Sequence, residues 1–334
     1  MADLRRNRVT GDWVLVAGGR EDRPRELMVR TGEPDARDLD PECPLCPGNE
    51  SQTPPTILEL PGPAGEPWQV RVVANKYSAL APSGGESGVS GPGQWTAGSQ
   101  EVVVETRVHN ASPYDFDHAR FEMGLAAVRE RYRALMSSPP VQLVLPFKNH
   151  GASSGASLVH AHSQIAALTF VPHQVARRAR LAEREFAQAG DCPVCRLTGE
   201  EIDAGTRVVS TTGTFVVLEP FASCSTAETW IVPLAHQASF AEVGEVQLSD
   251  LAGSLQRSIR SIGAVYGEPA FNYVIHSSPR NLRFATGLHW YLQLIPRLTV
   301  PGGFEFGTAT MINTLPPEQA AIALREAWPR EDEG

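Results

Sequence analysis

Two CPxC motifs, each followed by two widely spaced histidines, constrain the fold of this chain more than any other feature. In chain order the two sets are Cys43, Cys46, His109 and His160, then Cys192, Cys195, His236 and His289. The two histidines of each set stand 51 and 53 residues apart, while the interval from the cysteines to the first histidine is 63 residues in one set and 41 in the other. Such a recurrence indicates an internal repeat. A chance similarity of two strand-rich halves is the alternative.

The expected secondary structure follows the same order in both halves. In the first half, residues 101–109 and 141–147 have strand character, residues 116–137 are helical, and residues 158–168 run extended. In the second half, strands at 207–221 precede a helix at 246–266 and strands at 271–276 and 288–296. A charged helix at 172–189 joins the halves. We predict an α+β protein of two tandem units, each an antiparallel sheet with packed helices, divided into residues 1–180 and 181–334. A length of 334 residues suits two domains.

Each Cys/His set has the composition of a closed, tetrahedral zinc site. The chain has five cysteines, and an odd number speaks against a disulfide framework. A redox CxxC is the alternative, but neither pair is expected to follow a strand and open a helix as in thioredoxin. We therefore predict two Zn²⁺ ions per chain, with iron as the alternative at one site.

His162 is the histidine that the metal sites leave over. On an extended segment His160, His162 and Gln164 share one face. If His160 binds metal, His162 is free, and a neutral imidazole is a competent nucleophile toward phosphorus. Gln164 can donate a hydrogen bond to the phosphate oxygens. A core histidine bonded to a backbone carbonyl is the alternative. The second half has Tyr291 at the matching position, so we expect that half to be structural only.

A turn of small residues, NHGASSGAS (149–157), precedes this histidine. Gly151 and Gly155 allow backbone N–H groups to approach phosphate oxygens. Lys148 is interpreted either as a phosphate contact or as an exposed lysine. The net charge of -9 excludes broad nucleic-acid binding but not a small phosphorylated ligand. No apolar stretch reaches the length of a membrane span, so we expect a cytoplasmic protein without nucleic-acid or membrane partners.

With these motifs the sequence resembles the galactose-1-phosphate uridylyltransferase family of the histidine-triad superfamily. The resemblance covers nearly the whole chain, through WVLVAGGREDRP, CPLCPGNE, ETRVH, FKNHGASSGAS, HAHSQ and GGFEFGTATMINTLPPEQAA. It implies half-barrel sheets, a homodimer, and a ping-pong transfer of a nucleoside monophosphate between a nucleotide sugar and a sugar 1-phosphate. The implied site residues are His162 as nucleophile, Gln164, Asn149, Gly155 and Ser157 at the phosphates, Arg20 and Arg23 near them, Asn75 at the nucleotide, and Glu305 at the sugar hydroxyls.

Two departures from the family pattern bear on the substrate. Ala161 replaces the usual proline of HPHxQ, and HWYLQL stands where relatives often have HWHLEI. The FKN-x-GAS-x-GAS motif and the second CxxC are more similar to plant-type ADP-glucose phosphorylases, which use inorganic phosphate as acceptor. Three functions are therefore open: a UDP-glucose:hexose-1-phosphate uridylyltransferase, an ADP-glucose phosphorylase-type adenylyltransferase, and a zinc-containing protein that binds nucleotides without catalysis.

Overall fold

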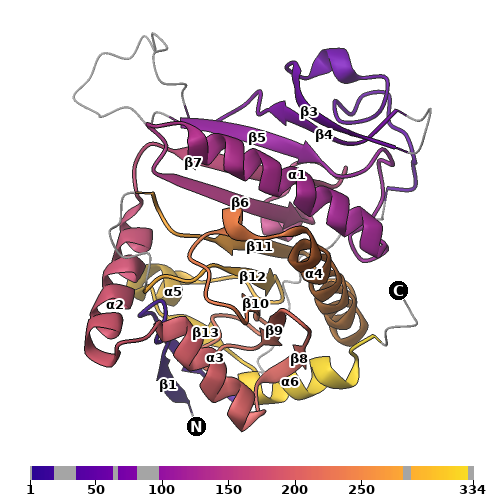
Figure 1. Ribbon diagram of the computed structural model, residues 1–334. Helices are drawn as coiled ribbons and strands as arrows, with labels where there is room; N and C mark the ends of the chain where they lie inside the picture. The colour runs from indigo at the N-terminus through magenta and orange to yellow at the C-terminus, as the bar shows by residue number, and fades with distance from the viewer. Residues whose placement is uncertain (1, 19–34, 63–66, 81–97, 281–286, 330–334) are drawn as a thin grey trace.

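A ten-stranded antiparallel sheet runs through the protein and joins its two halves (Figure 1). The computed structural model describes residues 2–18, 35–62, 67–80, 98–280 and 287–329. The strand order in the sheet is β3-β4-β5-β7-β6-β11-β12-β10-β9-β8. The strands of the first half are β3 (Thr56–Pro61), β4 (Trp68–Ala74), β5 (Gly98–Val104), β6 (Leu143–His150) and β7 (His162–Leu168). Those of the second half are β8 (Val208–Thr211), β9 (Phe215–Leu218), β10 (Thr229–Pro233), β11 (Phe271–His276) and β12 (Tyr291–Pro296).

The two halves meet where β6 pairs with β11 in antiparallel register, from Phe271 opposite His150 to Val274 opposite Phe147. The predicted α+β class with antiparallel sheets and packed helices is confirmed, and this pairing makes the two expected sheets into one. A domain boundary at residue 180 stays a prediction. It falls inside the connecting helix α2 (His173–Ala189).

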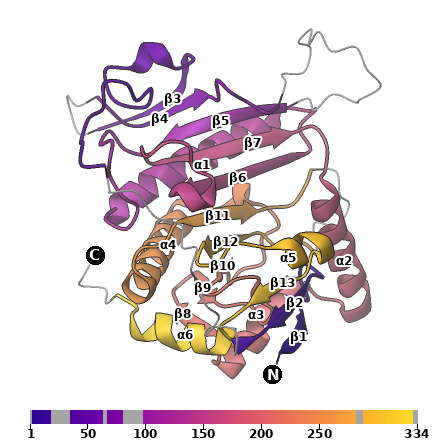
Figure 2. The same cartoon turned by 180° about the vertical axis from the view of Figure 1, so that it is seen from behind.

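Helices cover both faces of the sheet. The long helices α1 (His118–Ser137) and α4 (Glu245–Tyr266) pack on one face through alternating apolar residues such as Val144, Ile165 and Leu292. Figure 2 shows this layer behind the sheet, with α1 behind β5, β6 and β7. Helix α3 (Pro193–Ala204) packs on the opposite face of the second half. None of the described helices is long and apolar enough to cross a membrane.

The N-terminal segment packs on the second half of the chain. Strand β1 (Asp3–Arg6) pairs with β2 (Trp13–Val16), which pairs in parallel with β13 (Met311–Asn313) near the C-terminus. Two short helices flank β13 in sequence, α5 (Gly303–Thr308) and α6 (Pro317–Glu326). The terminal segments are thus held together although they are far apart in sequence.

The strand around HAHSQ is shorter than the sequence analysis expects. The extended segment was expected from Leu158, but β7 begins at His162 and the chain bends at residues 159–160. His160 therefore precedes the strand, and only His162 and Gln164 share its face. The expected strand from Glu101 likewise ends at Val104, where the chain leaves the sheet. Both departures bring a histidine to the first cysteine pair.

Candidate active site and metal centres

Cys43, Cys46, His109 and His160, here called the N-terminal cluster, lie together and are all buried. The Nδ1 atoms of His109 and His160 lie 3.4 and 3.5 Å from Cys46 Sγ, and His160 Nδ1 lies 3.8 Å from Cys43 Sγ. A tetrahedral ion with Zn–S near 2.3 Å and Zn–N near 2.0–2.1 Å would separate sulfur and nitrogen by about 3.6 Å. The four residues therefore fit a metal ion of the size and preference of zinc.

Neighbouring acceptors orient both histidines of the N-terminal cluster. His160 Nε2 donates to the Thr106 carbonyl at 2.8 Å, which leaves Nδ1 with its lone pair directed at the sulfur atoms. His109 Nε2 lies 3.4 Å from Asp35 Oδ2 and 3.8 Å from an Asp40 oxygen. Burial lowers the pKa of His160 to about 4, so its ring is neutral at neutral pH, as a metal ligand must be. Such acceptors are the usual partners of metal-binding histidines.

Cys192, Cys195, His236 and His289, the C-terminal cluster, have a similar arrangement. Cys195 Sγ lies 3.4 Å from His236 Nδ1 and 3.3 Å from His289 Nδ1, and Cys192 Sγ lies 4.0 Å from His289 Nδ1. Cys192 is the residue before helix α3, and the element preceding it is helix α2, not a strand. Cys195 is partly exposed and His236 is exposed, so this cluster is more open to solvent than the first.

His162 lies at the start of β7 and is 7% exposed. Its Nδ1 donates to the His160 carbonyl at 2.8 Å, which fixes the proton on Nδ1 and leaves the Nε2 lone pair for a substrate. Burial lowers the pKa of His162 and so favours the neutral, nucleophilic ring. The alternative interpretation of His162 was a core histidine hydrogen-bonded to a backbone carbonyl, and that hydrogen bond is present. It is compatible with nucleophilic chemistry because it uses only one of the two ring nitrogens.

Gln164 lies two residues further along the same face and is held by two amides. Its Oε1 accepts from Gln100 Nε2 at 2.6 Å and from Asn75 Nδ2 at 3.4 Å. Because both bonds use the oxygen, the Nε2 group of Gln164 is the end that can donate to a phosphate. The structure thus brings together Asn75 and Gln164, two of the predicted site residues. Gln100, which the sequence analysis did not select, fixes the direction of the Gln164 amide.

The turn between β6 and β7 has the conformation that its glycines allow. Gly151 and Gly155 have φ angles of 80° and 88°, values that side chains with a Cβ rarely adopt. Asn149 Oδ1 accepts from Asn272 Nδ2 at 2.7 Å, and the same nitrogen donates to the Ser154 carbonyl at 2.9 Å. Asn272 belongs to β11, so the second half holds the turn of the first. No pattern in the sequence pointed to it, because its role comes only from pairing with Asn149.

The remaining predicted substrate-binding residues form no hydrogen bond with His162 or Gln164 within the described residues. Gly155 and Ser157 are exposed in the turn, and no hydrogen bond of Ser157 is formed with a described residue. Glu305 Oε2 accepts from the Gly302 N–H at 2.9 Å and so caps its own helix, α5. No hydrogen bond or ion pair joins Glu305 to His162 among the described parts of the chain. Arg20 and Arg23 lie outside the described residues.

Lys148 is neither a phosphate contact nor exposed, so both interpretations of it were wrong. It is 1% exposed and forms an ion pair with Glu105. Its Nζ also donates to the His162 carbonyl at 3.2 Å. Ser163 donates to the same carboxylate and lies 2.6 Å from Tyr273 Oη. Since Ser163, Lys148 and Tyr273 face one another across β7, β6 and β11, this network supports the strand that carries His162 from its opposite face.

Comparisons with known proteins place this geometry in a family. The family described as galactose-1-phosphate uridyl transferase, N-terminal domain, matches residues 1–172. The chain is 32% identical to an ADP-glucose phosphorylase of Arabidopsis thaliana, over 97% of this chain and 92% of that protein. It is 26% identical to a galactose-1-phosphate uridylyltransferase of Thermotoga maritima, over 98% of each chain. The crystal structure of an Arabidopsis thaliana ADP-glucose phosphorylase with bound ADP-glucose superimposes with a TM-score of 0.84 at 31% identity, covering 98% of this chain and 99% of that one.

The family match covers just over half of the chain, and the relatives extend it over nearly the full length. Nucleotide sugars and sugar phosphates are the substrates of this family. The chain therefore belongs to the galactose-1-phosphate uridylyltransferase family and is a nucleotidyltransferase.

Proposed function

We propose that the protein transfers a nucleoside monophosphate through a covalent intermediate on His162. The observation that best supports this proposal is the hydrogen bond from His162 Nδ1 to the His160 carbonyl, because it leaves Nε2 as the free ring nitrogen beside Gln164. In the first step Nε2 attacks the α-phosphorus of a nucleotide sugar, a P–N bond forms, and the P–O bond to the sugar 1-phosphate breaks. In the second step an acceptor oxygen attacks the same phosphorus, and the P–N bond breaks.

The residues around His162 have distinct roles in this proposal. The proton stays on His162 Nδ1 in both steps and remains hydrogen-bonded to the His160 carbonyl, which stabilises the imidazolium that forms on attack without proton transfer. The Gln164 amide, fixed by Gln100 and Asn75, donates to the non-bridging oxygens of the α-phosphate. The N–H groups of the 151–157 turn hold the leaving phosphate, with Asn149, Gly155 and Ser157 at its border. Arg20 and Arg23 would add positive charge near the phosphates.

We propose ADP-glucose as the donor and inorganic phosphate as the acceptor. The support is the 32% identity over nearly the whole chain to an ADP-glucose phosphorylase, against 26% to the uridylyltransferase of Thermotoga maritima. The products would be glucose 1-phosphate and ADP. UDP-glucose with a hexose 1-phosphate acceptor is the second candidate, favoured by the family to which the first half belongs.

Zinc is the ion that we propose for both clusters, two per chain, because two thiolates and two imidazoles form its preferred tetrahedral set. Bound zinc would supply structural bracing by holding His160, whose carbonyl in turn orients His162. Thiolates that hold metal require a reducing compartment, so we propose a cytoplasmic location. A non-catalytic nucleotide-binding protein would need the same clusters but not the free Nε2 of His162.

A homodimer is also part of the proposal. Helix α5 exposes Phe304 and Phe306, with 47% and 80% of their surface accessible, beside Glu305. Exposed aromatic residues of this kind are typical of protein interfaces. We propose that this segment packs on a second copy of the chain and places Glu305 near the sugar hydroxyls of the partner's site.

Intact-protein mass spectrometry after alkaline quench tests the covalent step and the base together. Wild-type protein is incubated separately with ADP-glucose and UDP-glucose, and His162→Ala serves as the control. An adduct of AMP mass on the wild type alone supports the first candidate, and one of UMP mass supports the second. Release of the adduct by phosphate or by galactose 1-phosphate identifies the acceptor. Metal-loaded protein that forms no adduct with either donor would refute the covalent proposal.

A further inference from the structure

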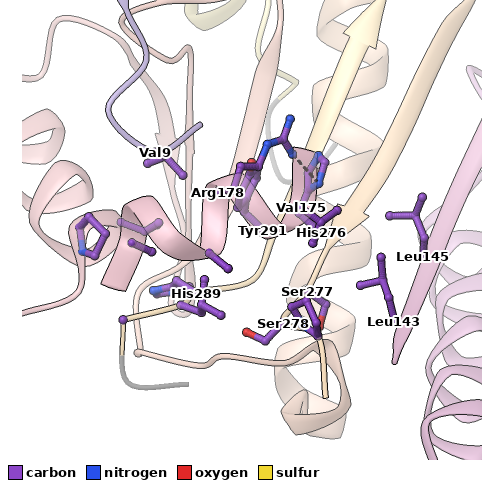
Figure 3. Close-up of a pocket in the computed structure, with 17 residues that line it drawn as sticks. Val9, Leu143, Leu145, Val175, Arg178, His276, Ser277, Ser278, His289 and Tyr291 are labelled. Atoms are coloured by element: carbon purple, nitrogen blue, oxygen red, sulfur yellow. Dashed lines mark hydrogen bonds between the residues drawn. The ribbon is translucent and has the colours of Figure 1, made fainter. Parts of the chain in front are cut away.

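A cavity of about 70 Å³ lies where the two halves meet, between helix α2 and the sheet at β6, β11 and β12 (Figure 3). Its position repeats that of the active site. His276 on β11 pairs with Tyr291 on β12. In the first half the last pair of β6 and β7 is Lys148 with Ser163, so the next residues, Asn149 and His162, stand in the same relation. Tyr291 also follows the metal-binding position His289 by two residues, as His162 follows His160. The cavity therefore lies where the second unit would hold a phosphate group.

Catalysis cannot occur in this second site, because its equivalent groups are already engaged. Tyr291 replaces the nucleophile, and its ring stacks on Trp230 with centroids 4.3 Å apart. Gln293, at the position of Gln164, donates to Glu228 at 2.7 Å and accepts from His276 at 2.7 Å. The second unit therefore has a cavity at this position but no imidazole nitrogen that could act as the nucleophile.

The polar atoms that remain unpartnered around this cavity are hydrogen-bond donors. Tyr291 Oη, His289 Nε2 and Arg178 Nε are buried and have no partner among the described residues. Tyr291 and His289 are 3% and 7% exposed, and both line the cavity together with Arg178. In the first unit the atom that matches His289 Nε2 is satisfied, because His160 Nε2 donates to Thr106. A buried donor without an acceptor calls for a partner, and a water or a bound molecule can supply one.

Arg178 gives this cavity its charge. Its Nη1 donates to His276 Nδ1 at 3.1 Å, and no carboxylate of the described residues forms an ion pair with it. Burial and the charge of Arg178 lower the pKa of His276 to about 3, so its ring is neutral and its Nδ1 can accept the hydrogen bond from the guanidinium. Figure 3 shows Arg178 joined to His276 by this hydrogen bond, with Tyr291 close to both. The rest of the wall is mainly apolar, with Val175 and Ala179 of α2 facing Leu143 and Leu145 of β6.

We propose that this cavity binds a small organic anion, with its charged group on Arg178 and Tyr291 and its apolar body between α2 and β6. The charged group is a carboxylate or a phosphate, since both accept hydrogen bonds from guanidinium and phenol groups. The site is separate from His162, and its occupancy does not depend on the proposed transfer reaction. A ligand here contacts the helix that connects the halves and the histidine that belongs to the C-terminal cluster.

Isothermal titration calorimetry of the metal-loaded protein tests this proposal with three probes. They are 4-methylpentanoate, its neutral amide and inorganic phosphate. We expect the carboxylate to bind and the amide to bind at least about tenfold more weakly, because the amide lacks the charge that Arg178 recognises. Binding of phosphate on the same residues, with no binding of the carboxylate, would identify a phosphate group instead.

Variants on the same helix and strand show where a probe binds. Arg178→Gln and Tyr291→Phe should each weaken binding, by about tenfold or more for Arg178→Gln. Arg180→Gln, which removes an exposed arginine two residues away, should leave binding unchanged. His162→Ala should also leave it unchanged, which separates this site from the catalytic one. No binding of any probe to wild type, or binding unaffected by both Arg178→Gln and Tyr291→Phe, would overturn the proposal.

Discussion

Removal of the Lys148 ammonium should destabilise the protein far more than the loss of an exposed cation. The side chains of Lys148 and Glu105 are 2% and 9% exposed, so neither charge has water to replace its partner. Breaking a buried ion pair by deleting one partner costs about 3–5 kcal/mol, because the remaining charge is left uncompensated. In Lys148→Met the Glu105 carboxylate keeps, among the described residues, only the hydrogen bond from Ser163, and the His162 carbonyl loses a charged donor.

An exposed ion pair supplies the matched control. The side chains of Arg8 and Glu200 are 47% and 51% exposed. Such pairs contribute about 0–1 kcal/mol, since water and salt screen them. Arg8→Gln should therefore change the free energy of unfolding by less than about 1 kcal/mol, although it also removes one positive charge.

Urea unfolding of metal-loaded protein, followed by circular dichroism, measures both variants under the same conditions. We expect the midpoint of Lys148→Met to lie well below those of wild type and Arg8→Gln. The double variant Lys148→Met/Glu105→Leu should recover much of the loss, because it removes the stranded carboxylate as well. If Lys148→Met lies within about 1 kcal/mol of Arg8→Gln, or if the double variant is no more stable than the single one, the argument from burial is refuted.

Three further predictions concern metal, pH and the backbone. A chelator should remove metal from the C-terminal cluster first, because Cys195 is partly exposed whereas every ligand of the N-terminal cluster is buried; equal rates of metal release in a colorimetric assay would contradict this. Burial and the charge of Glu228 raise the pKa of Glu219 well above its ordinary value of 4.5, so the contribution of this carboxyl to stability is fully present below pH 4.5 and is lost as the pH rises toward the raised pKa. Glu219→Gln should therefore stabilise the protein at pH 8 more than at pH 4.5 in thermal unfolding, and a pH-independent difference would oppose this assignment. Gly190→Ala, at a left-handed residue (φ 79°, ψ 0°) with nothing within 4 Å, should cost only the roughly 1–2 kcal/mol of that conformation. Gly151→Ala should cost more, because a φ of 80° with a ψ of 156° suits glycine alone and the added Cβ would lie 2.7 Å from that of Ala270.

The sequence was sufficient to predict features that depend on spacing along the chain. The two Cys/His sets, the helices α1, α2 and α4, and strand β11 follow from local periodicity and motif order, and the structure confirms them. The availability of His162 was also predictable, because four ligands complete a metal site and leave one histidine over.

Features that depend on contacts between distant segments could not be predicted in this way. The burial of Lys148 follows from Glu105 and Tyr273, which a single sequence does not place beside it. The bend at His160 depends on the distant cysteines: it places the His160 ring against Cys46, while His162 lies on strand β7. Asn272 and Gln100 act only through residues from other strands, so no local pattern distinguishes them from ordinary strand residues.

The pairing of β6 with β11 also decides whether either half could exist without the other. A strand at the border of a sheet carries a row of free N–H and C=O groups, which is a template for association with other chains. Cutting the chain within α2 would expose such a row on β6 in one fragment and on β11 in the other. Each fragment would then have an unpaired edge strand that is complementary to the edge strand of the other. The two fragments should therefore associate when produced together and aggregate when produced alone.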